Sequence, residues 1–202
     1  MLGKTHLVTG VATTLAVTRP TSLSELILAV GVGGVGALIS DIDVGTSSSH
    51  RDADKITALT VIVVLGVLVI DHFFNTGIVE RVIRYSGYGR IVVGGLMFIG
   101  ICAFGKEQPH RSFMHSLLGL FLLCFAIGLM WEKAIVYFAV GFLSHLATDI
   151  FNKKKVRILY PLRGGVSLGM FHAHGVANYV LFLIGSAVTV IELVLFMVRI
   201  FR

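Results

Sequence analysis

The stretch AIVYFAVGFLSHLATDIF, residues Ala134–Phe151, is an apolar segment that carries a histidine and an aspartate near its end. Its length approaches the roughly 20 residues that a helix needs to cross the hydrocarbon core of a bilayer. His145 and Asp149 are four positions apart, so a helix places them on one face. Ionisable side chains inside a membrane segment are costly, and they mark functional sites by default. The stretch therefore predicts a membrane helix with a functional pair at one end.

The composition of the whole chain indicates the same class of protein. Of its 202 residues, 55% are hydrophobic and only 14% are charged, whereas soluble domains carry roughly 25% charged residues. The 23 glycines fit this class, because small residues let membrane helices approach closely. We attribute the net charge of +6 to anionic headgroups and membrane topology, so no nucleic-acid partner is expected. We expect a single membrane-embedded domain over residues 1–202.

Six segments are apolar enough to be predicted as membrane spans. They are Leu23–Ser40, Ile56–Phe74, Ile91–Gly105, Phe113–Trp131, Ala134–Phe151 and Ala177–Ile200. Leu7–Val17 is too short to span easily, and we expect a short helix that dips into the bilayer or packs among the others. Gly77–Tyr88 mixes basic and apolar residues, which fits an interfacial amphipathic helix or a plain basic loop. The predicted fold is an all-α, polytopic helical bundle.

If the short first helix reverses the chain, four separate regions bring histidine and carboxylate side chains to one membrane face. This histidine face holds His6, Asp41, Asp43, His110, His115, His145 and Asp149. It also holds ten of the 17 basic residues, namely Lys4, Arg51, Lys55, Lys106, Arg111, Lys153, Lys154, Lys155, Arg157 and Arg163. Positive charge favours the cytoplasm. We therefore predict a multi-pass protein of the inner (cytoplasmic) membrane whose histidine face is cytoplasmic.

Each polar motif has a chemical and a structural interpretation. His145 and Asp149 offer good ligands for zinc and similar metals, or they lock helices together by hydrogen bonds. Two acids in SDID, residues Ser40–Asp43, follow an apolar helix. Carboxylates at a helix C-terminus oppose the macrodipole, so a bound cation would compensate. The alternative is a solvated loop.

The remaining histidine motifs frame the same face. In PHRSFMHS, residues Pro109–Ser116, a loop His110 and a first-turn His115 can face one point. Arg111 between them suits an anionic oxygen or phosphate, or it faces lipid headgroups. His6, at a helix N-terminus, is favoured in the neutral form that binds metal, although a lone histidine there is more often structural. His72 lies on the opposite face, and the roles of His50, His172 and His174 stay open.

The ordered motifs GKTH, SDID, HRSFMHS, SHLATD and LYPL resemble the YdjM-like family, described as membrane-bound, metal-dependent hydrolases, some of them under LexA control. The sequence departs from the family pattern at Ser40, Met114 and Val44. More distantly, the layout is similar to zinc-dependent phospholipase C and fungal zinc nucleases. That likeness implies hydrolysis of a phosphoester, and the membrane setting implies a lipid-borne substrate.

These observations lead to the hypothesis of an integral membrane metallohydrolase. The metal ligands would be the seven histidines and aspartates of the histidine face, and they exceed the four that one zinc takes. We therefore expect one to three divalent ions, zinc first. Asp41 or Asp149 would orient a metal-activated water, and Arg111 would stabilise developing negative charge. The alternative is a non-enzymatic metal-binding protein, either a transporter or a protein with a structural metal. A transporter should carry polar residues at mid-membrane depth.

Overall fold

The structure is a computed structural model that describes residues 2–45, 48–77, 79–80, 84, 86–172 and 175–201. This part of the chain is helical, as predicted, and holds no strand beyond two isolated bridges. The elements are α1 (Gly3–Thr18), α2 (Leu23–Ile39), η1 (Ser40–Asp43), α3 (Ser48–Phe74), α5 (Ser86–Lys106), η2 (Phe113–His115), α6 (Leu117–Met130), α7 (Ala134–Ile150) and α8 (Val176–Ile200).

Three helical stretches in the described residues are long and apolar enough to cross a membrane. They are Leu23–Asp43, Gly87–Lys106 and Val176–Ile200, and the helices α6 and α7 are apolar but shorter. These lengths support three of the predicted spans, while the number six stays a prediction. The short first helix is present as α1. The predicted Gly77–Tyr88 helix falls partly on residues 78, 81–83 and 85, which lie outside the described part of the chain.

One predicted boundary was wrong, because α6 begins at Leu117 and not at Phe113. Residues Phe113–His115 form the short 3-10 helix η2. The hydroxyl of Ser116 then accepts a hydrogen bond from the Gly119 N–H at 3.0 Å, which is the usual way to satisfy the free N–H groups of a first helical turn. This extra turn places His115 ahead of α6 instead of inside it.

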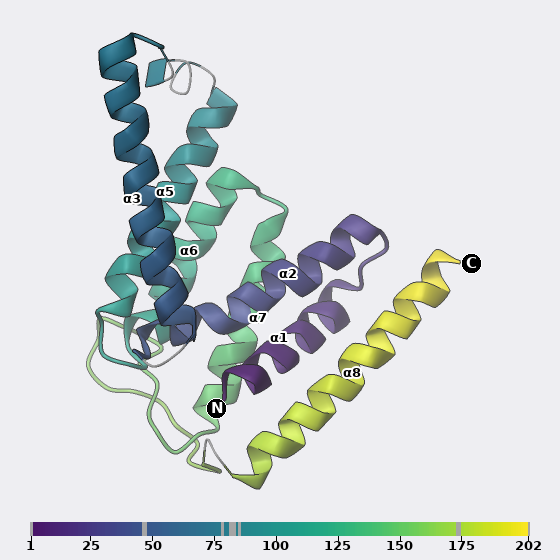
Figure 1. Ribbon diagram of the computed structural model, residues 1–202. Coiled ribbons are helices and arrows are strands. Elements are labelled where there is room, and N and C mark those ends of the chain that lie inside the picture. The colour runs from purple at the N-terminus through teal and green to yellow at the C-terminus, as the bar shows by residue number, and fades with distance from the viewer. Residues whose placement is uncertain are drawn as a thin grey trace.

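The helices α1, α2 and α7 form a close-packed group, and α1 also packs along α8 (Figure 1). A Cβ atom on Gly141 of α7 would collide with the carbonyl oxygen of Gly33, and one on Gly36 would collide with that of Phe138. The backbones of α2 and α7 therefore touch, as expected for glycine-lined membrane helices. This contact carries the end of α2, with η1 behind it, against the last two turns of α7.

Several chain segments that are distant in the sequence end at one side of the bundle. The N-terminal end of α1, η1, η2 and the C-terminal end of α7 all lie there (Figure 1). The N–H of Leu2 donates to the side-chain oxygen of Asn178 at 3.1 Å, which ties the chain start to the start of α8. The fold thus assembles one polar end from four regions of sequence.

Candidate metal centre

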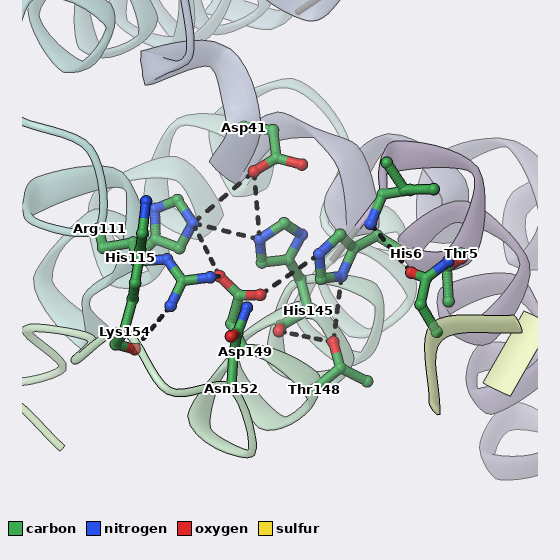
Figure 2. A network of polar contacts seen from close by, with 12 residues as sticks. Thr5, His6, Asp41, Arg111, His115, His145, Thr148, Asp149, Asn152 and Lys154 are labelled. Atoms are coloured by element: carbon green, nitrogen blue, oxygen red, sulfur yellow. Dashed lines mark hydrogen bonds and ion pairs between the residues drawn. The ribbon is translucent and has the colours of Figure 1, made fainter. Parts of the chain in front are cut away.

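The seven histidines and aspartates of the histidine face form one network, of which Figure 2 shows His6, Asp41, His115, His145 and Asp149. His6 comes from α1, Asp41 and Asp43 from η1, and His145 and Asp149 from α7. His110 lies in the loop before η2, and His115 ends η2. All seven residues predicted from sequence are therefore brought together. Two groups could hold a metal ion, one formed by Asp41, Asp43, His110 and His115, the other by His6, His145 and Asp149.

Short distances join these two groups at their centre. The Nε2 atoms of His115 and His145 lie 3.2 Å apart. Asp41 Oδ1 lies 3.8 Å from His115 Nε2 and 3.7 Å from His145 Nε2. Asp149 Oδ2 lies 3.6 Å from His115 Nε2. Tetrahedral zinc with bonds of about 2.0–2.1 Å would space its ligand atoms about 3.3 Å apart, so these four distances are close to the spacing of zinc ligands.

The other ring nitrogen of each central histidine faces an oxygen atom outside the centre. His145 Nδ1 lies 2.7 Å from the carbonyl oxygen of Ala37, on α2. A carbonyl oxygen only accepts hydrogen bonds, so Nδ1 carries the hydrogen and Nε2 of the neutral ring presents a lone pair to the centre. His115 Nδ1 lies 3.3 Å from Asp43 Oδ2 but without the geometry of a hydrogen bond, so this contact places the ring beside Asp43 and does not fix its tautomer. Histidines that bind metals are held as His145 is here.

His6 approaches the centre from the opposite side to His115. Its ring stacks on that of His145, with ring centroids 3.8 Å apart. Its Nδ1 lies 3.0 Å from the hydroxyl of Thr148, and its Nε2 faces Asp149 Oδ1 at 3.4 Å. That Nε2 atom is buried without a hydrogen-bond partner. Because a buried polar atom is costly when it is unsatisfied, this orphaned donor atom fits a metal ligand.

The centre is buried at three histidines and one aspartate and is more exposed on the side of Asp41 and His110. The side chains of His6, His115 and His145 are fully buried, and Asp149 almost fully. The side chain of Asp41 is 16% exposed and that of His110 is 37% exposed. Asp41 and His110 are therefore the members of the cluster that are most exposed. Asp43 is buried, so the solvated-loop interpretation of SDID is wrong for this residue.

Asp43 is engaged by three nitrogen atoms. Its Oδ1 lies 2.8 Å from His110 Nδ1, and its Oδ2 accepts from the backbone N–H of Arg111 at 3.2 Å. The third is the Nδ1 atom of His115 described above. Although Asp43 belongs to a metal-capable group by distance alone, these contacts make it a holder of two histidines.

Arg111 is buried in the network, which argues against the alternative interpretation of a side chain that faces lipid headgroups. Its Nη2 lies 3.0 Å from Asp149 Oδ2, and its Nη1 donates to the carbonyl oxygen of Lys154 at 2.6 Å. Its backbone has φ of +66°, a conformation that costs a residue with a Cβ roughly 1–2 kcal/mol. The strained residue thus combines a left-handed backbone with a buried guanidinium that contacts Asp149.

The roles of His50, His172 and His174 stay open. The side chain of His172 is exposed, while the side chain of His50 and all of His174 lie outside what the structure describes. Sequence reasoning missed Thr148 and the carbonyl oxygens of Ala37 and Lys154. Thr148 is three positions after His145 and could have been found from that spacing. Nothing in the side-chain pattern marks the two carbonyls.

The fold and the centre together define a helical membrane protein with a buried histidine–aspartate cluster that could hold a metal ion. The chain matches the family model described as YdjM inner membrane protein over residues 1–201, and it belongs to that family. Comparisons with curated proteins and with solved structures find no match. The family and the three long apolar stretches both support a location in the membrane.

Proposed function

We propose that this protein is a membrane-bound, metal-dependent hydrolase that cleaves a phosphoester bond of a lipid-borne substrate. The observation that carries the proposal is the approach of two histidines and two aspartates: His115 Nε2 lies 3.2–3.8 Å from His145 Nε2, Asp41 Oδ1 and Asp149 Oδ2, and Asp41 Oδ1 lies 3.7 Å from His145 Nε2. Imidazole and carboxylate ligands of this kind suit zinc. The ligand set is asymmetric in exposure, which gives a substrate one route of approach.

Five residues would contact the ion or ions directly, namely His6, Asp41, His115, His145 and Asp149. Asp149 presents one oxygen to His6 and the other to His115, so it can serve one ion or join two. Asp43, Thr148 and the Ala37 carbonyl would hold the imidazoles in place. A bound divalent ion would supply a Lewis acid and make water a stronger nucleophile near neutral pH.

The open side of the centre carries the residues that would act on the substrate. Asp41 is the more exposed of the two central carboxylates. We therefore propose that Asp41 would orient the attacking water and accept a proton from that water. His110 has an exposed ring whose Nδ1 atom is held by Asp43. We therefore propose that His110 would donate a proton to the leaving oxygen. Arg111 would stabilise negative charge that develops near Asp149.

A lipid-borne substrate fits the place of the centre in the bundle. The centre lies at the ends of α2 and α7, where apolar helices give way to polar loops. A phosphate near the headgroup plane could reach it while its acyl or polyprenyl chain stays in the bilayer. A phospholipid and a polyprenyl-phosphate ester both have this shape.

A structural metal is the second candidate, and the burial of His6, His115 and His145 favours it. A structural zinc is enclosed by protein ligands, whereas a catalytic zinc keeps one position open. The two candidates differ in what the exposed residues Asp41 and His110 do. Only the hydrolase needs them for turnover after the metal is bound.

The decisive experiment measures metal and turnover on the same purified protein. We expect elemental analysis to find a divalent metal, and hydrolysis assays to release phosphate or a phosphorylated headgroup from a panel of phospholipids and polyprenyl phosphates. Chelation should abolish turnover, and the original metal should restore it, with Asp149→Ala as the inactive control. Protein that carries no metal would refute the site. Full metal content without turnover across the panel would support the structural role.

We also propose six membrane spans with the histidine face toward the cytoplasm. The native cysteines Cys102 and Cys124 lie within apolar helices, so they can be replaced to give a background without thiols. A cysteine introduced at Lys154 should then resist a membrane-impermeant thiol reagent applied to intact cells and react after lysis. A cysteine introduced at Lys133, at the other end of α7, should react in intact cells. The reverse pattern would overturn the orientation.

A further inference from the structure

Residues 151–171 form an ordered hairpin between α7 and α8, at the same end of the bundle as the N-terminus (Figure 1). The two sides of the hairpin pair through Val156 and Val166, whose backbones exchange hydrogen bonds of 2.8 and 2.9 Å. A separate bridge of parallel sense joins Asn152 and Phe171 at the base of the segment. Val156 is fully buried. The hairpin is therefore a packed element and not a loose connection.

The hairpin is fastened directly to the histidine–aspartate centre. The backbone N–H of Arg157 donates to the carbonyl oxygen of Arg111 at 2.9 Å, and Arg111 Nη1 donates to the carbonyl oxygen of Lys154. The same guanidinium contacts Asp149. One arginine thus connects the backbone of the hairpin to the centre, which sets the position of the neighbouring lysines.

The outer surface of the hairpin combines apolar and basic residues. Leu159 and Leu162, at its tip, are 63% and 65% exposed. The tip is braced from inside, because Arg157 Nη2 donates to the carbonyl oxygens of Pro161 and Leu162 at 3.2 and 3.1 Å. Lys153, Lys154 and Lys155 are exposed on the side nearer the centre. Exposed leucines on a braced turn are unfavourable in water.

The charge of the hairpin is of one sign. Residues 151–171 contain Lys153, Lys154, Lys155, Arg157 and Arg163 but no aspartate or glutamate. An apolar face next to a basic one is the pattern of segments that lie in the membrane interface. Basic residues beside a bilayer attract anionic lipids, whereas zwitterionic lipids give no such net attraction. The charge therefore selects between the two classes of lipid.

We infer that this hairpin is an anionic-lipid binding element. Its leucine tip enters the interface, and Lys153–Lys155 hold the phosphate of an anionic phospholipid beside the opening of the centre. The inference rests on the proposed function only in treating the held lipid as a source of substrate. Binding itself requires neither metal nor turnover, so each of the two proposals can fail without the other.

The test uses fluorescence, because the chain has a single tryptophan. Trp131 follows α6, at the end of α7 remote from the centre. A Trp131→Phe, Leu159→Trp protein carries the only indole at the hairpin tip, and Trp131→Phe, Leu162→Trp gives a second probe. Each is reconstituted into phosphatidylcholine vesicles that contain an equal fraction of dibrominated phosphatidylglycerol or dibrominated phosphatidylcholine, whose bromine atoms quench nearby indoles. Protein with only the native Trp131 is the control for the other end.

We expect both tip probes to be quenched more strongly by the anionic lipid and the native Trp131 to be quenched equally by both. Substitution of Lys153, Lys154 and Lys155 by Gln should remove the preference. Each lysine near an anionic surface contributes roughly fivefold, so relative affinity should fall about 100-fold. Because Arg111 contacts only the backbone of Lys154 in this bond, the substitution preserves the fastening of the hairpin. Lys133→Gln should leave the preference intact.

Three results would overturn the inference. Equal quenching of the tip probes by both brominated lipids would show that the hairpin does not select anionic lipid. No quenching by either lipid would show that the tip stays in water. A preference that survives the triple lysine substitution would also count against it, because the selection would then arise elsewhere on the chain.

Discussion

The two ends of the α2–α7 pair both carry polar residues, but they satisfy them differently. At the start of α2, Glu25 accepts from the N–H of Thr21 at 2.8 Å, and its own N–H donates to the Ser22 hydroxyl. These partners are three or four positions apart. At the other end, His110 meets Asp43 across 67 positions and His145 meets Ala37 across 108.

This difference separates ordinary helix capping from a candidate site. Local partners arise whenever a helix begins with serine and glutamate. Partners from four regions require the whole fold, and they leave ring nitrogens of His115 and His145 facing two carboxylates. Ring nitrogens from two separate segments that face each other beside two carboxylates indicate a ligand.

Removing a central ligand should have the largest effect. We expect His145→Ala and Asp149→Ala to abolish metal binding, because each removes an atom at the point where the two groups meet. Elemental analysis of protein purified in parallel checks the outcome. His72→Ala is the matched control, since His72 is an exposed histidine at the end of α3. Equal metal content in all three variants would remove the basis of the site.

Removing the exposed histidine should separate turnover from metal binding. We expect His110→Ala to lower kcat by about 100-fold to 10,000-fold, the usual loss of a general acid, while the protein keeps its metal. Lipid hydrolysis assayed together with metal content checks this result. If the variant loses its metal as well, His110 is a ligand, as the sequence first suggested. If turnover is unchanged, the leaving oxygen is protonated by another group.

Neutralising Asp43, which contacts His110 and His115, should weaken metal binding without removing any of the four central atoms. Asp43→Asn keeps the shape of the side chain, but it removes the charge that faces His110, His115 and the Arg111 N–H. Loss of such an outer partner typically costs 10-fold to 100-fold in affinity. Competition with a chelating indicator measures this change. Complete loss of metal would instead make Asp43 a direct ligand.

Changing the contact between α2 and α7 should affect the stability of the whole pair. Gly141→Ala would force the two backbones apart, because its Cβ collides with the Gly33 carbonyl. Overpacking of this kind costs about 1–3 kcal/mol of unfolding free energy. Thermal unfolding in detergent, followed by circular dichroism, measures the loss. Gly31→Ala is the control on α2, since nothing lies within 4 Å of its Cβ, and it should be neutral or stabilising.

Removing the N-cap of α2 should have the smallest effect. Ser22→Ala removes the hydroxyl that accepts from the Glu25 N–H, and such a change costs about 1 kcal/mol. Metal content and metal affinity should be unchanged, because the centre lies at the other end of the pair. The same thermal and chelator measurements apply. A loss of metal here would mean that the two ends are not independent.

Much of the site could be predicted from the sequence because its residue types are unusual in their setting. Histidine and aspartate near the ends of apolar segments are costly, so their positions stand out against a background of leucine, valine and glycine. The trace of the chain across the membrane then assigns them to one face. The all-α class follows equally directly from the length and hydrophobicity of the segments.

The division of roles within the cluster could not be predicted. Asp41 and Asp43 are equivalent in SDID, yet one faces the central nitrogens and the other holds His110 and His115. The 3-10 turns η1 and η2 cause this difference, and such short turns follow from packing more than from sequence pattern. The start of α6 was missed for the same reason.

The sequence by itself determined that this chain is a helical membrane protein with a polar end, because hydrophobicity and the cost of buried charge act on each segment separately. Only the tertiary structure decided which nitrogen of each histidine faces inward and that Arg111 connects Asp149 to the hairpin. Those features depend on backbone carbonyls and on the close approach of α2 to α7. They arise from contacts between distant segments, which no local pattern records.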